Sequence, residues 1–267
     1  MNFKRGIVLY LFLVVVILIA IVSSPRENKI EKSNQLGLVV AEAPAEMQFE
    51  PINTFSIAAT ISAKKATEIS SGVIVTDKVD DLLVLINKHI RLPETYEPGD
   101  LVAIDGKVSV VRSGMVLRKE AANALAEMSV VALKDEVNLV VLSAYRSYWT
   151  QQATFSMWVG AAGLASAETF SARPGHSQHQ LGTTVDFTSE SVNLGLTENF
   201  SASKEGKWLA DNAYKYGFVL AYPKGKEYIT GYMYEPWHYR YIGAENAQQM
   251  VESGLILEEY LRHFGVV

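Results

Sequence analysis

The chain has 267 residues, of which 49% are hydrophobic and 20% charged, enough to bury one core of domain size. It contains no cysteine, which excludes disulfides and thiolate metal sites. The net charge is −5, and because no basic run or aromatic-basic patch accompanies it, nucleic acid is not expected as a partner.

An almost wholly apolar run extends from Gly6 to Val22, directly after Lys4 and Arg5. Its length is at the short end for a membrane span, and two interpretations compete: a cleaved signal peptide and an uncleaved anchor. The anchor is favoured because Pro25 follows the nearest candidate cleavage point and the run exceeds the usual apolar core of a signal peptide. Either way, the flanking positive charges predict that the bulk of the chain lies outside the cell. No cysteine follows the run, so a lipid-anchored lipoprotein is excluded.

Three segments are therefore predicted: a membrane anchor or signal segment over residues 1–23, an extracellular stalk over 24–71 and a globular domain over 72–267. The stalk is mixed polar and alanine-rich and includes Glu42-Ala-Pro-Ala-Glu46, a composition typical of extended linkers.

Hydrophobic spacing predicts the elements of the globular domain. Helices are expected over 117–134, 148–159, 204–216, 244–253 and 257–263, with Ser203 as the N-cap and Gly217 as the stop of the third. Strands are expected over 137–143, 183–187, 218–222 and within 228–241. Because these strands are too close in sequence for repeated parallel crossovers, the predicted fold class is α+β, a small mainly antiparallel sheet flanked by helices.

Residues 171–187 hold the first cluster of candidate metal ligands. Pro174-Gly175 predicts a turn before a short strand, and between them lie His176 and His179, with Asp186 seven residues after the second histidine. Imidazole and carboxylate are the groups that bind zinc where thiolates are absent. Two ligands do not make a site, so a third is required.

The candidate third ligand lies far downstream, in Glu235-Pro-Trp-His238. The proline makes a shared helix face improbable, and the alternating aromatic residues favour a strand bent at Pro236. Such a bend lets Glu235 and His238 enter one pocket, which a flat strand forbids. His238 on a metal with Glu235 beside the attacking water matches catalytic zinc sites, which combine three protein ligands with a separate carboxylate.

Together these segments resemble the zinc carboxypeptidases of bacterial cell-wall metabolism, the D-alanyl-D-alanine carboxypeptidases of the vancomycin-resistance Y type, whose relatives include L,D-carboxypeptidases of the same fold. The resemblance covers roughly residues 82–261 and rests on Ser143-Ala-Tyr-Arg-Ser147, Pro174-Gly-His-Ser-Gln-His179 through Asp186, Trp208-Leu209, Tyr216-Gly-Phe218, Tyr222-Pro223 and Glu235-Pro-Trp-His238. It implies the α+β fold shared with hedgehog-like peptidases.

The resemblance also implies roles for individual residues: one zinc ion on His179, Asp186 and His238, with Glu235 as the catalytic base, and substrate contacts from Arg146, Gln151 and Ser177. The planar guanidinium of Arg146 suits either a terminal carboxylate or the developing oxyanion. Tyr145 and Trp237 are candidates for the pocket walls, although packing explains aromatic residues equally well. His176 is left open between support of the metal site and support of its loop, and His89 and His263 are expected on the surface.

The implied function is removal of the C-terminal D-alanine from peptidoglycan stem peptides by a monomeric enzyme held at the membrane. Two alternatives remain open. The first is an L,D-carboxypeptidase that acts on the tetrapeptide stem. The second is a non-catalytic scaffold that binds wall peptide, and against it counts the presence of all three ligands and of the carboxylate base.

Overall fold

The computed structural model describes residues 72–266, so the predicted membrane segment and stalk lie outside the described residues. Within residues 72–266, no helix combines the length and the apolar character needed to cross a membrane.

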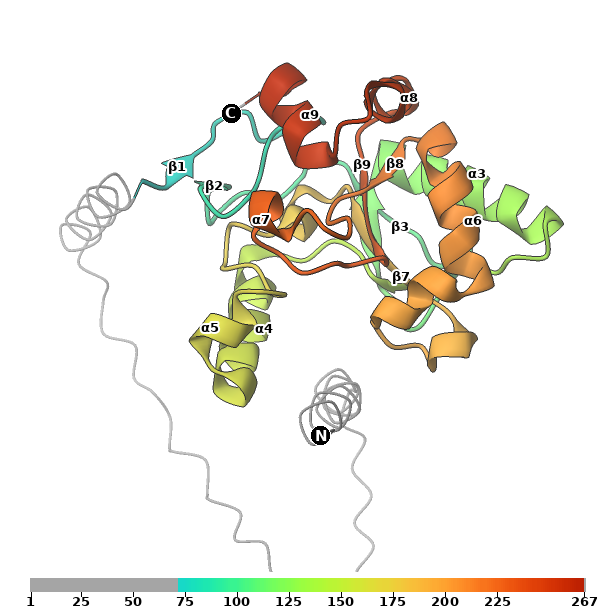
Figure 1. Ribbon diagram of the computed structural model, residues 1–267, viewed down its shortest axis with the longest axis horizontal. Coiled ribbons are helices and arrows are strands. Elements are labelled where there is room, and N and C mark those ends of the chain that lie inside the picture. The colour runs from blue at the N-terminus through green and yellow to red at the C-terminus, as the bar shows by residue number, and fades with distance from the viewer. Residues whose placement is uncertain (1–71, 267) are drawn as a thin grey trace, which may run out of the picture. The chain divides into compact units, whose positions relative to one another are not determined.

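A five-stranded sheet with strand order β4-β6-β7-β9-β8 forms the centre of the domain (Figure 1). Its members are β4 (Ser109–Val110), β6 (Val140–Ser143), β7 (Thr184–Thr188), β8 (Phe218–Leu220) and β9 (His238–Tyr241). β4 pairs with β6 in parallel, and every other pairing in this sheet is antiparallel. The predicted α+β class is therefore confirmed.

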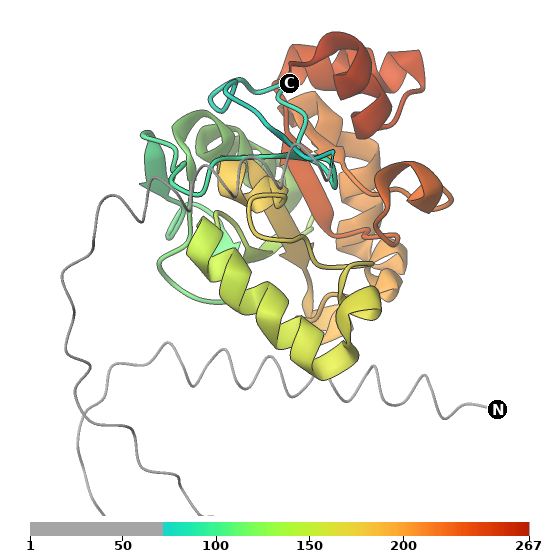
Figure 2. The same ribbon diagram turned by 90° about the vertical axis from the view of Figure 1, so that its left-hand side faces the viewer.

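Helices and short turns surround this sheet. The helices are α3 (Lys119–Lys134), α4 (Tyr148–Ala162), α5 (Leu164–Ala167), α6 (Lys204–Asn212), α7 (Glu227–Thr230), α8 (Ala244–Ser253) and α9 (Leu257–Phe264). Four 3-10 turns join them, η1 (Gln178–Leu181), η2 (Glu190–Val192), η3 (Glu198–Ala202) and η4 (Ala213–Tyr216). Two small ladders complete the domain, β1 (Ile74–Val75) with β2 (Ile90–Arg91) and β3 (Leu101–Ala103) with β5 (Val116–Arg118). In Figures 1 and 2, α4 and α5 extend from the domain on the opposite side of the sheet from α3 and α6.

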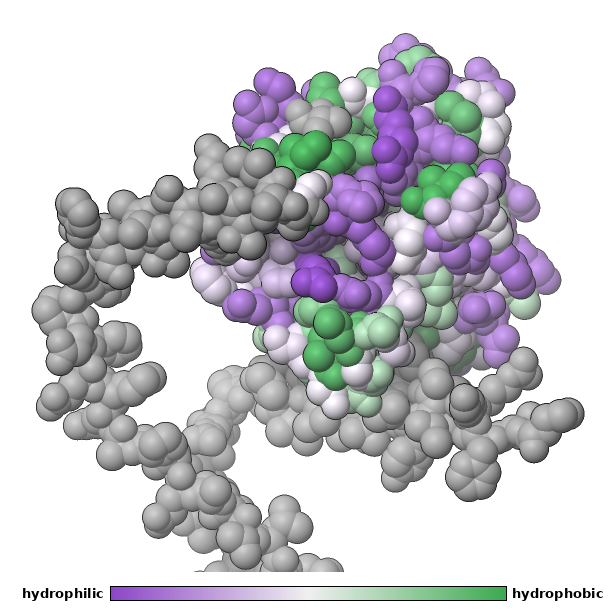
Figure 3. Space-filling view, turned by 60° about the vertical axis from the view of Figure 1, so that its left-hand side comes forward, coloured by the Kyte–Doolittle hydropathy of each residue, from purple (hydrophilic) through white to green (hydrophobic). Residues whose placement is uncertain are grey.

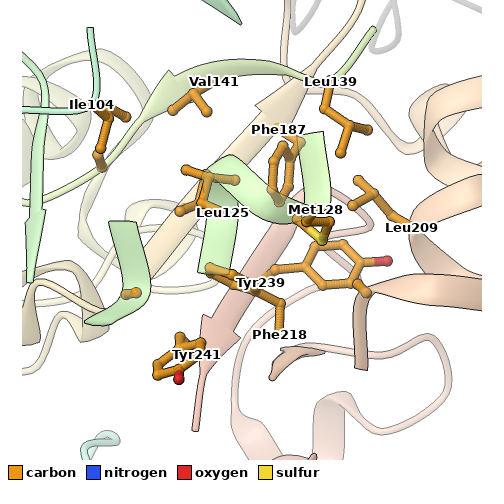
Figure 4. Packing of buried hydrophobic residues seen from close by; sticks show 14 of the residues in the cluster. Ile104, Leu125, Met128, Leu139, Val141, Phe187, Leu209, Phe218, Tyr239 and Tyr241 are labelled. Carbon is orange, nitrogen blue, oxygen red and sulfur yellow. The ribbon is translucent and has the colours of Figure 1, made fainter. Parts of the chain in front are cut away.

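Successive side chains of the central strands point alternately into the hydrophobic core on one face of the sheet and toward the candidate metal ligands on the other. Val185 and Phe187 of β7 and Tyr239 of β9 enter the main hydrophobic cluster, where Leu125 of α3 is also fully buried (Figure 4). Asp186 lies between Val185 and Phe187, and His238 directly precedes Tyr239. Because successive side chains of a strand alternate in direction, Asp186 and His238 face the other side of the sheet. Truncating Leu125 to alanine would remove a fully buried side chain and cost about 2–5 kcal/mol of stability.

Several predicted element boundaries are wrong. The helix expected over 117–134 begins only at Lys119, because Leu117 and Arg118 pair with β3. The stretch 228–241 was expected to be strand, but it contains α7 and a turn, and ladder pairing starts only at His238. Tyr232 and Trp237, which precede His238, are buried without belonging to a strand, and aromatic content alone cannot distinguish these two environments.

The helix predicted over 204–216 forms as α6 followed directly by the 3-10 turn η4. Ser203 caps α6 as predicted, since its hydroxyl accepts a hydrogen bond from the Gly206 N–H at 2.9 Å. Gly217 ends the segment in the left-handed region, with φ of +83°. A side chain there would also collide with the Tyr241 ring, 2.6 Å from an added Cβ, so glycine is needed for both reasons.

Candidate active site

Asp186 lies at the centre of the site because of the register of the sheet. On one side it pairs with Ser143 of β6, and on the other with His238 of β9. Residues directly opposite in adjacent strands point to the same face, so the register alone brings Asp186 and His238 together. β6 is irregular between Val141 and Ser143, and such bulges often redirect side chains beside functional sites.

His179 reaches the same place from the turn η1, just before β7. The predicted turn at Pro174-Gly175 is present, with Gly175 at φ of +83° and a hydrogen bond from His176 N–H to Arg173 O. His179 is then held from two sides: its Nδ1 lies 2.7 Å from Ala144 O, and its own carbonyl accepts from the Arg146 N–H at 3.2 Å. The backbone after β6 therefore orients the ring.

The three predicted metal ligands, His179, Asp186 and His238, lie next to one another. His179 Nε2 lies 3.1 Å from Asp186 Oδ2, and His238 Nδ1 lies 3.0 Å from Asp186 Oδ1. One ligand atom from each residue falls within 4.8 Å of the other two, and all three side chains are buried. Donors bound to a tetrahedral zinc ion are roughly 3.3 Å apart, given bond lengths near 2 Å. In the described part of the chain, no other group of three such side chains gathers in this way.

His179 presents one ring nitrogen to the Asp186 carboxylate. A carbonyl can only accept, so Nδ1 of His179 carries the proton that Ala144 O receives. Burial lowers the pKa of His179 to about 4, which leaves its Nε2 as a lone pair facing the Asp186 carboxylate. The pKa of Asp186 is itself held well below its ordinary value, because the two imidazoles outweigh the opposing effect of burial. A cation placed between His179 Nε2 and the Asp186 carboxylate would be bound by both groups.

Gln178 fixes the second ring in the same way. Its Oε1 lies 3.2 Å from His238 Nε2, and on the other side of the ring Nδ1 lies 3.0 Å from Asp186 Oδ1. The carbonyl of Gln178 in turn accepts from the Thr184 hydroxyl at 3.1 Å. Hydrogen bonds of this kind to metal-binding histidines set the tautomer and the ring orientation. The sequence analysis did not identify Gln178 in this role.

Glu235 lies beside the three ligands. The backbone turns at Glu235 and Pro236, with a hydrogen bond from His238 N–H to Glu235 O, and Glu235 Oε2 is 3.5 Å from His238 Nδ1. The bend is thus a tight turn before the strand, and it brings both residues into one pocket. Burial, and next the charge of Asp186, raises the pKa of Glu235 well above its ordinary value, while Arg146 and Lys88 oppose the rise.

Arg146 completes the polar wall of the site. Its Nη2 lies 3.9 Å from Asp186 Oδ2, and its Nη1 donates to Gln151 Oε1 at 2.9 Å. Gln151 is almost fully buried and donates through Nε2 to Ala172 O at 2.6 Å. Gln151 therefore holds Arg146 in place, whereas sequence reasoning considered only a direct substrate contact.

Residues 114–244 match the family model described as VanY, D-alanyl-D-alanine carboxypeptidase. YodJ of Bacillus subtilis (strain 168) is 44% identical over 183 residues, which cover 68% of this chain and 67% of the relative. The chain belongs to the VanY family.

Two solved structures of VanY-family proteins also resemble the chain. The L,D-carboxypeptidase LdcB has a TM-score of 0.67 at 42% identity, covering 72% of this chain and 90% of its own. A mutant of the vancomycin-resistance D,D-pentapeptidase VanY in complex with Zn(II) has a TM-score of 0.57 at 34% identity. The match covers 67% of this chain and 98% of the VanY chain. Zinc also fits the two imidazoles and the carboxylate of this VanY-family site.

The remaining predicted site residues of this VanY-family domain differ in their surroundings. Tyr145 is half-buried, and burial, followed by the charge of Glu97, raises its pKa to about 12. Its hydroxyl oxygen is buried, and among residues 72–266 it has no hydrogen-bond partner. Ser177 is buried directly before η1. Trp237 belongs to the main hydrophobic cluster, which favours the packing interpretation over a pocket wall.

The other histidines lie away from the ligands. His176 Nδ1 is 2.8 Å from Asn87 O, so this side chain ties its loop to the segment before β2, and loop support is the interpretation that the contact favours. His89 and His263 are exposed, as predicted.

Proposed function

We propose that the domain is a zinc carboxypeptidase that removes the C-terminal D-alanine from peptidoglycan stem peptides, on the small α+β fold shared with hedgehog-like peptidases. The observation that carries the proposal is the pair of ring nitrogens, on His179 and His238, that face one carboxylate with a second carboxylate, Glu235, beside them. Such an arrangement binds a divalent cation and keeps an acid–base group in reach.

Zinc, when bound by His179, Asp186 and His238, supplies a Lewis acid that polarises the scissile carbonyl and makes water acidic enough to attack at neutral pH. Glu235 accepts the proton of the attacking water and delivers it to the leaving amine nitrogen. Burial raises the pKa of Glu235 above its ordinary value, a change in the direction that favours returning the proton to the leaving amine. Proton transfer of this kind contributes about 10²–10⁴-fold to rates.

Arg146 is the group suited to recognise the free terminal carboxylate. Its guanidinium is held by Gln151 and Ser143, with Nη2 3.4 Å from the Ser143 hydroxyl. A planar, pre-oriented fork binds a carboxylate through two parallel hydrogen bonds. Recognition of a free carboxylate explains an exopeptidase, since an internal peptide bond offers no such group.

A second candidate activity is that of an L,D-carboxypeptidase acting on tetrapeptide stems. It is supported by the 42% identity to LdcB, itself an L,D-carboxypeptidase. The two activities differ in the configuration of the residue before the scissile bond and share the same metal ligands and base. A scaffold that binds wall peptide without cleaving it is disfavoured, because such a protein has no use for a buried acid–base carboxylate.

For the location, we infer that the run Gly6–Val22 holds the chain at the membrane and that residues 72–267 act outside the cell, as a monomer. The support is the apolar composition of the run after Lys4 and Arg5. Extracellular placement also agrees with a substrate that belongs to the cell wall.

Mass analysis of muropeptides tests the proposed function. The full chain in detergent, supplied with zinc, is incubated with pentapeptide and tetrapeptide muropeptides. Loss of one alanine from the pentapeptide supports D,D-activity, and loss of one alanine from the tetrapeptide supports L,D-activity. Binding of both without cleavage would instead support the scaffold.

A further inference from the structure

We propose that Lys88 binds an acidic group on the acyl side of the substrate, that is, on the residues that precede the scissile bond. The inference rests on the proposed function and adds to it a preference for negatively charged peptides. Its basis is the place of Lys88, on the opposite side of the metal ligands from Arg146, and the lack of a carboxylate partner for its ammonium group.

A stack of aromatic rings connects the ammonium group of Lys88 to the metal ligands. Tyr222 lies against the ring of His238, with centroids 4.7 Å apart, and Tyr232 lies against Tyr222 at 4.8 Å. Nζ of Lys88 is 3.8 Å from the centroid of the Tyr232 ring, the geometry of a cation–π contact. An extended peptide advances about 3.3–3.6 Å per residue, so about four residues span the whole stack. An acidic side chain on the second or third residue before the scissile bond therefore reaches Nζ.

Arg146 and Lys88 lie on opposite sides of the metal ligands. Arg146 belongs to the segment after β6, and its Nη2 is 3.9 Å from Asp186 of β7. The strand order β6-β7-β9-β8 then leads through His238 of β9 to Tyr222, which follows β8. A peptide whose terminal carboxylate lies on Arg146 has its scissile bond at the metal ligands. Its preceding residues, if extended, continue toward Tyr222 and Lys88.

Lys88 has no acidic partner of its own. Its Nζ donates to the backbone carbonyl of Glu168 at 2.6 Å, and no carboxylate of residues 72–266 forms an ion pair with it. The Glu168 carboxylate is bound by Arg173 instead, whose Nε lies 2.6 Å from Oε1. Burial lowers the pKa of Lys88, and the nearby charge of Glu168 offsets this effect only in part. A carboxylate of the substrate would supply the missing negative charge.

The ammonium group is held in place before any ligand binds. The methylene chain of Lys88 packs against Gly231, where an added Cβ would lie 2.6 Å from Cε of the lysine. The loop after α7 is also tied to the end of α5, because the Met233 N–H donates to Thr169 O at 2.8 Å. A charge fixed in this way loses less conformational entropy on binding than a free surface lysine does.

A dissolved peptide has access to Lys88. The residue is partly exposed and precedes β2 by two positions. Figure 1 shows β2 beside α7, on the side of the domain that comes forward in Figure 3, where hydrophilic residues cover much of the described surface. Such a surface suits a polar, charged peptide.

Peptides that differ only in charge test the inference. The series is acetyl-X-X-D-alanyl-D-alanine, in which both X residues are glutamate, glutamine or lysine. If the muropeptide assay shows L,D-activity, the same series is made with L-alanine before the scissile bond. The wild type should cleave the glutamate peptide with a kcat/KM about tenfold above that of the glutamine peptide, as expected for a partly exposed pair of charged groups.

Lys88→Gln should abolish this preference, Lys88→Arg should keep it, and Lys88→Glu should reverse it in favour of the lysine peptide. Lys215→Gln is the matched control. Lys215 also lies over a tyrosine ring, with Nζ 5.7 Å from the centroid of Tyr214, but it belongs to η4, which packs against α3, α6 and α8. This control should keep the wild-type preference.

Equal kcat/KM of the wild type for the glutamate and glutamine peptides would overturn the inference. An equal loss for both peptides in Lys88→Gln would also overturn it, because Lys88 would then only hold its loop. Isothermal titration of the zinc-loaded Glu235→Gln protein with the same peptides separates this inference from the proposed function. Tighter binding of the glutamate peptide that disappears in the Lys88→Gln background would support Lys88 even if no peptide is cleaved, and equal affinities would count against it.

Discussion

Gln178 Oε1 lies 3.2 Å from Nε2 of His238, on the opposite edge of the ring from Asp186. Gln178 is adjacent in sequence to His179, yet it serves the ligand that lies far downstream. It is therefore a positioning residue for the metal site: its contact with Nε2 holds the ring with Nδ1 toward Asp186.

Replacing Gln178 with leucine should weaken zinc binding. The change removes the acceptor, so His238 no longer has a fixed tautomer, and losing such an outer hydrogen bond typically costs 10–100-fold in metal affinity. Gln178→Glu keeps an acceptor and should bind zinc nearly as tightly as the wild type. Competition with a chromophoric zinc chelator measures both affinities.

Gln180→Leu is the matched control for this measurement. Gln180 is also fully buried, but its amide donates to Pro93 O and Tyr96 O, away from the metal ligands. The Gln180→Leu variant should be less stable than the wild type but should bind zinc with the same affinity. Wild-type zinc affinity in Gln178→Leu would contradict the assigned role.

Glu235→Gln should abolish most of the activity while zinc stays bound. The amide has nearly the same shape as the carboxylate but accepts no proton, so we expect kcat to fall by about 10²–10⁴-fold. The zinc affinity should change little, since Glu235 is not one of the three ligands. Muropeptide cleavage and zinc content are measured on the same sample, and an active Glu235→Gln enzyme would remove Glu235 as the base.

The same substitution should stabilise the zinc-free protein as the pH rises. Folding raises the pKa of Glu235 above its ordinary value of 4.5, chiefly through burial, so the folded state retains a proton that the unfolded state releases. Below pH 4.5, the ordinary pKa, Glu235 is protonated in both the folded and the unfolded state, so its burial adds no pH-dependent cost to folding. Above it, the contribution of Glu235 to the free energy of unfolding falls by about 1.4 kcal/mol per pH unit until the folded pKa is reached.

Glu235→Gln removes this dependence, so its advantage over the wild type should grow between pH 5 and pH 7. Urea unfolding of the metal-free proteins at several pH values measures the difference. An advantage that stays constant across that range would show that the pKa of Glu235 is not raised in the fold.

The ligand set could be predicted from the sequence because each ligand lies in a short motif with a distinctive local structure. Pro174-Gly175 fixes the turn that precedes His179, and Pro236 fixes the turn that brings Glu235 and His238 together. Both depend on backbone restrictions that operate within a few residues. For such motifs, residue type and spacing carry most of the geometry.

The supporting contacts could not be predicted, because they depend on strand register. Asp186 meets His238 only through the pairing of β7 with β9, and Ala144 O meets His179 only because β6 flanks β7. The start of β9 at His238 could not be predicted within 228–241 for a related reason. Tyr232 is buried there beside Tyr222, with ring centroids 4.8 Å apart, and lies outside every strand.

Arg146 and Gln151 provide the last prediction, which concerns recognition of the substrate's free carboxylate. Arg146→Lys keeps the charge but loses the fork, so kcat/KM should fall for a peptide ending in a free acid. It should fall much less for the same peptide ending in an amide, which the wild type already cleaves poorly. An equal loss for both peptides would instead assign Arg146 to the developing oxyanion.

Gln151→Leu should reproduce this selective loss more weakly, because Arg146 keeps its charge but loses the hydrogen bond to Gln151 Oε1. A hydrogen bond to a charged group contributes about 1.5–3 kcal/mol, which corresponds to roughly 10- to 100-fold in kcat/KM. Gln152→Leu, at the exposed neighbouring position on α4, should leave both peptides unaffected. If Gln151→Leu behaves like Gln152→Leu, then Ser143 and the surrounding structure hold Arg146 without Gln151.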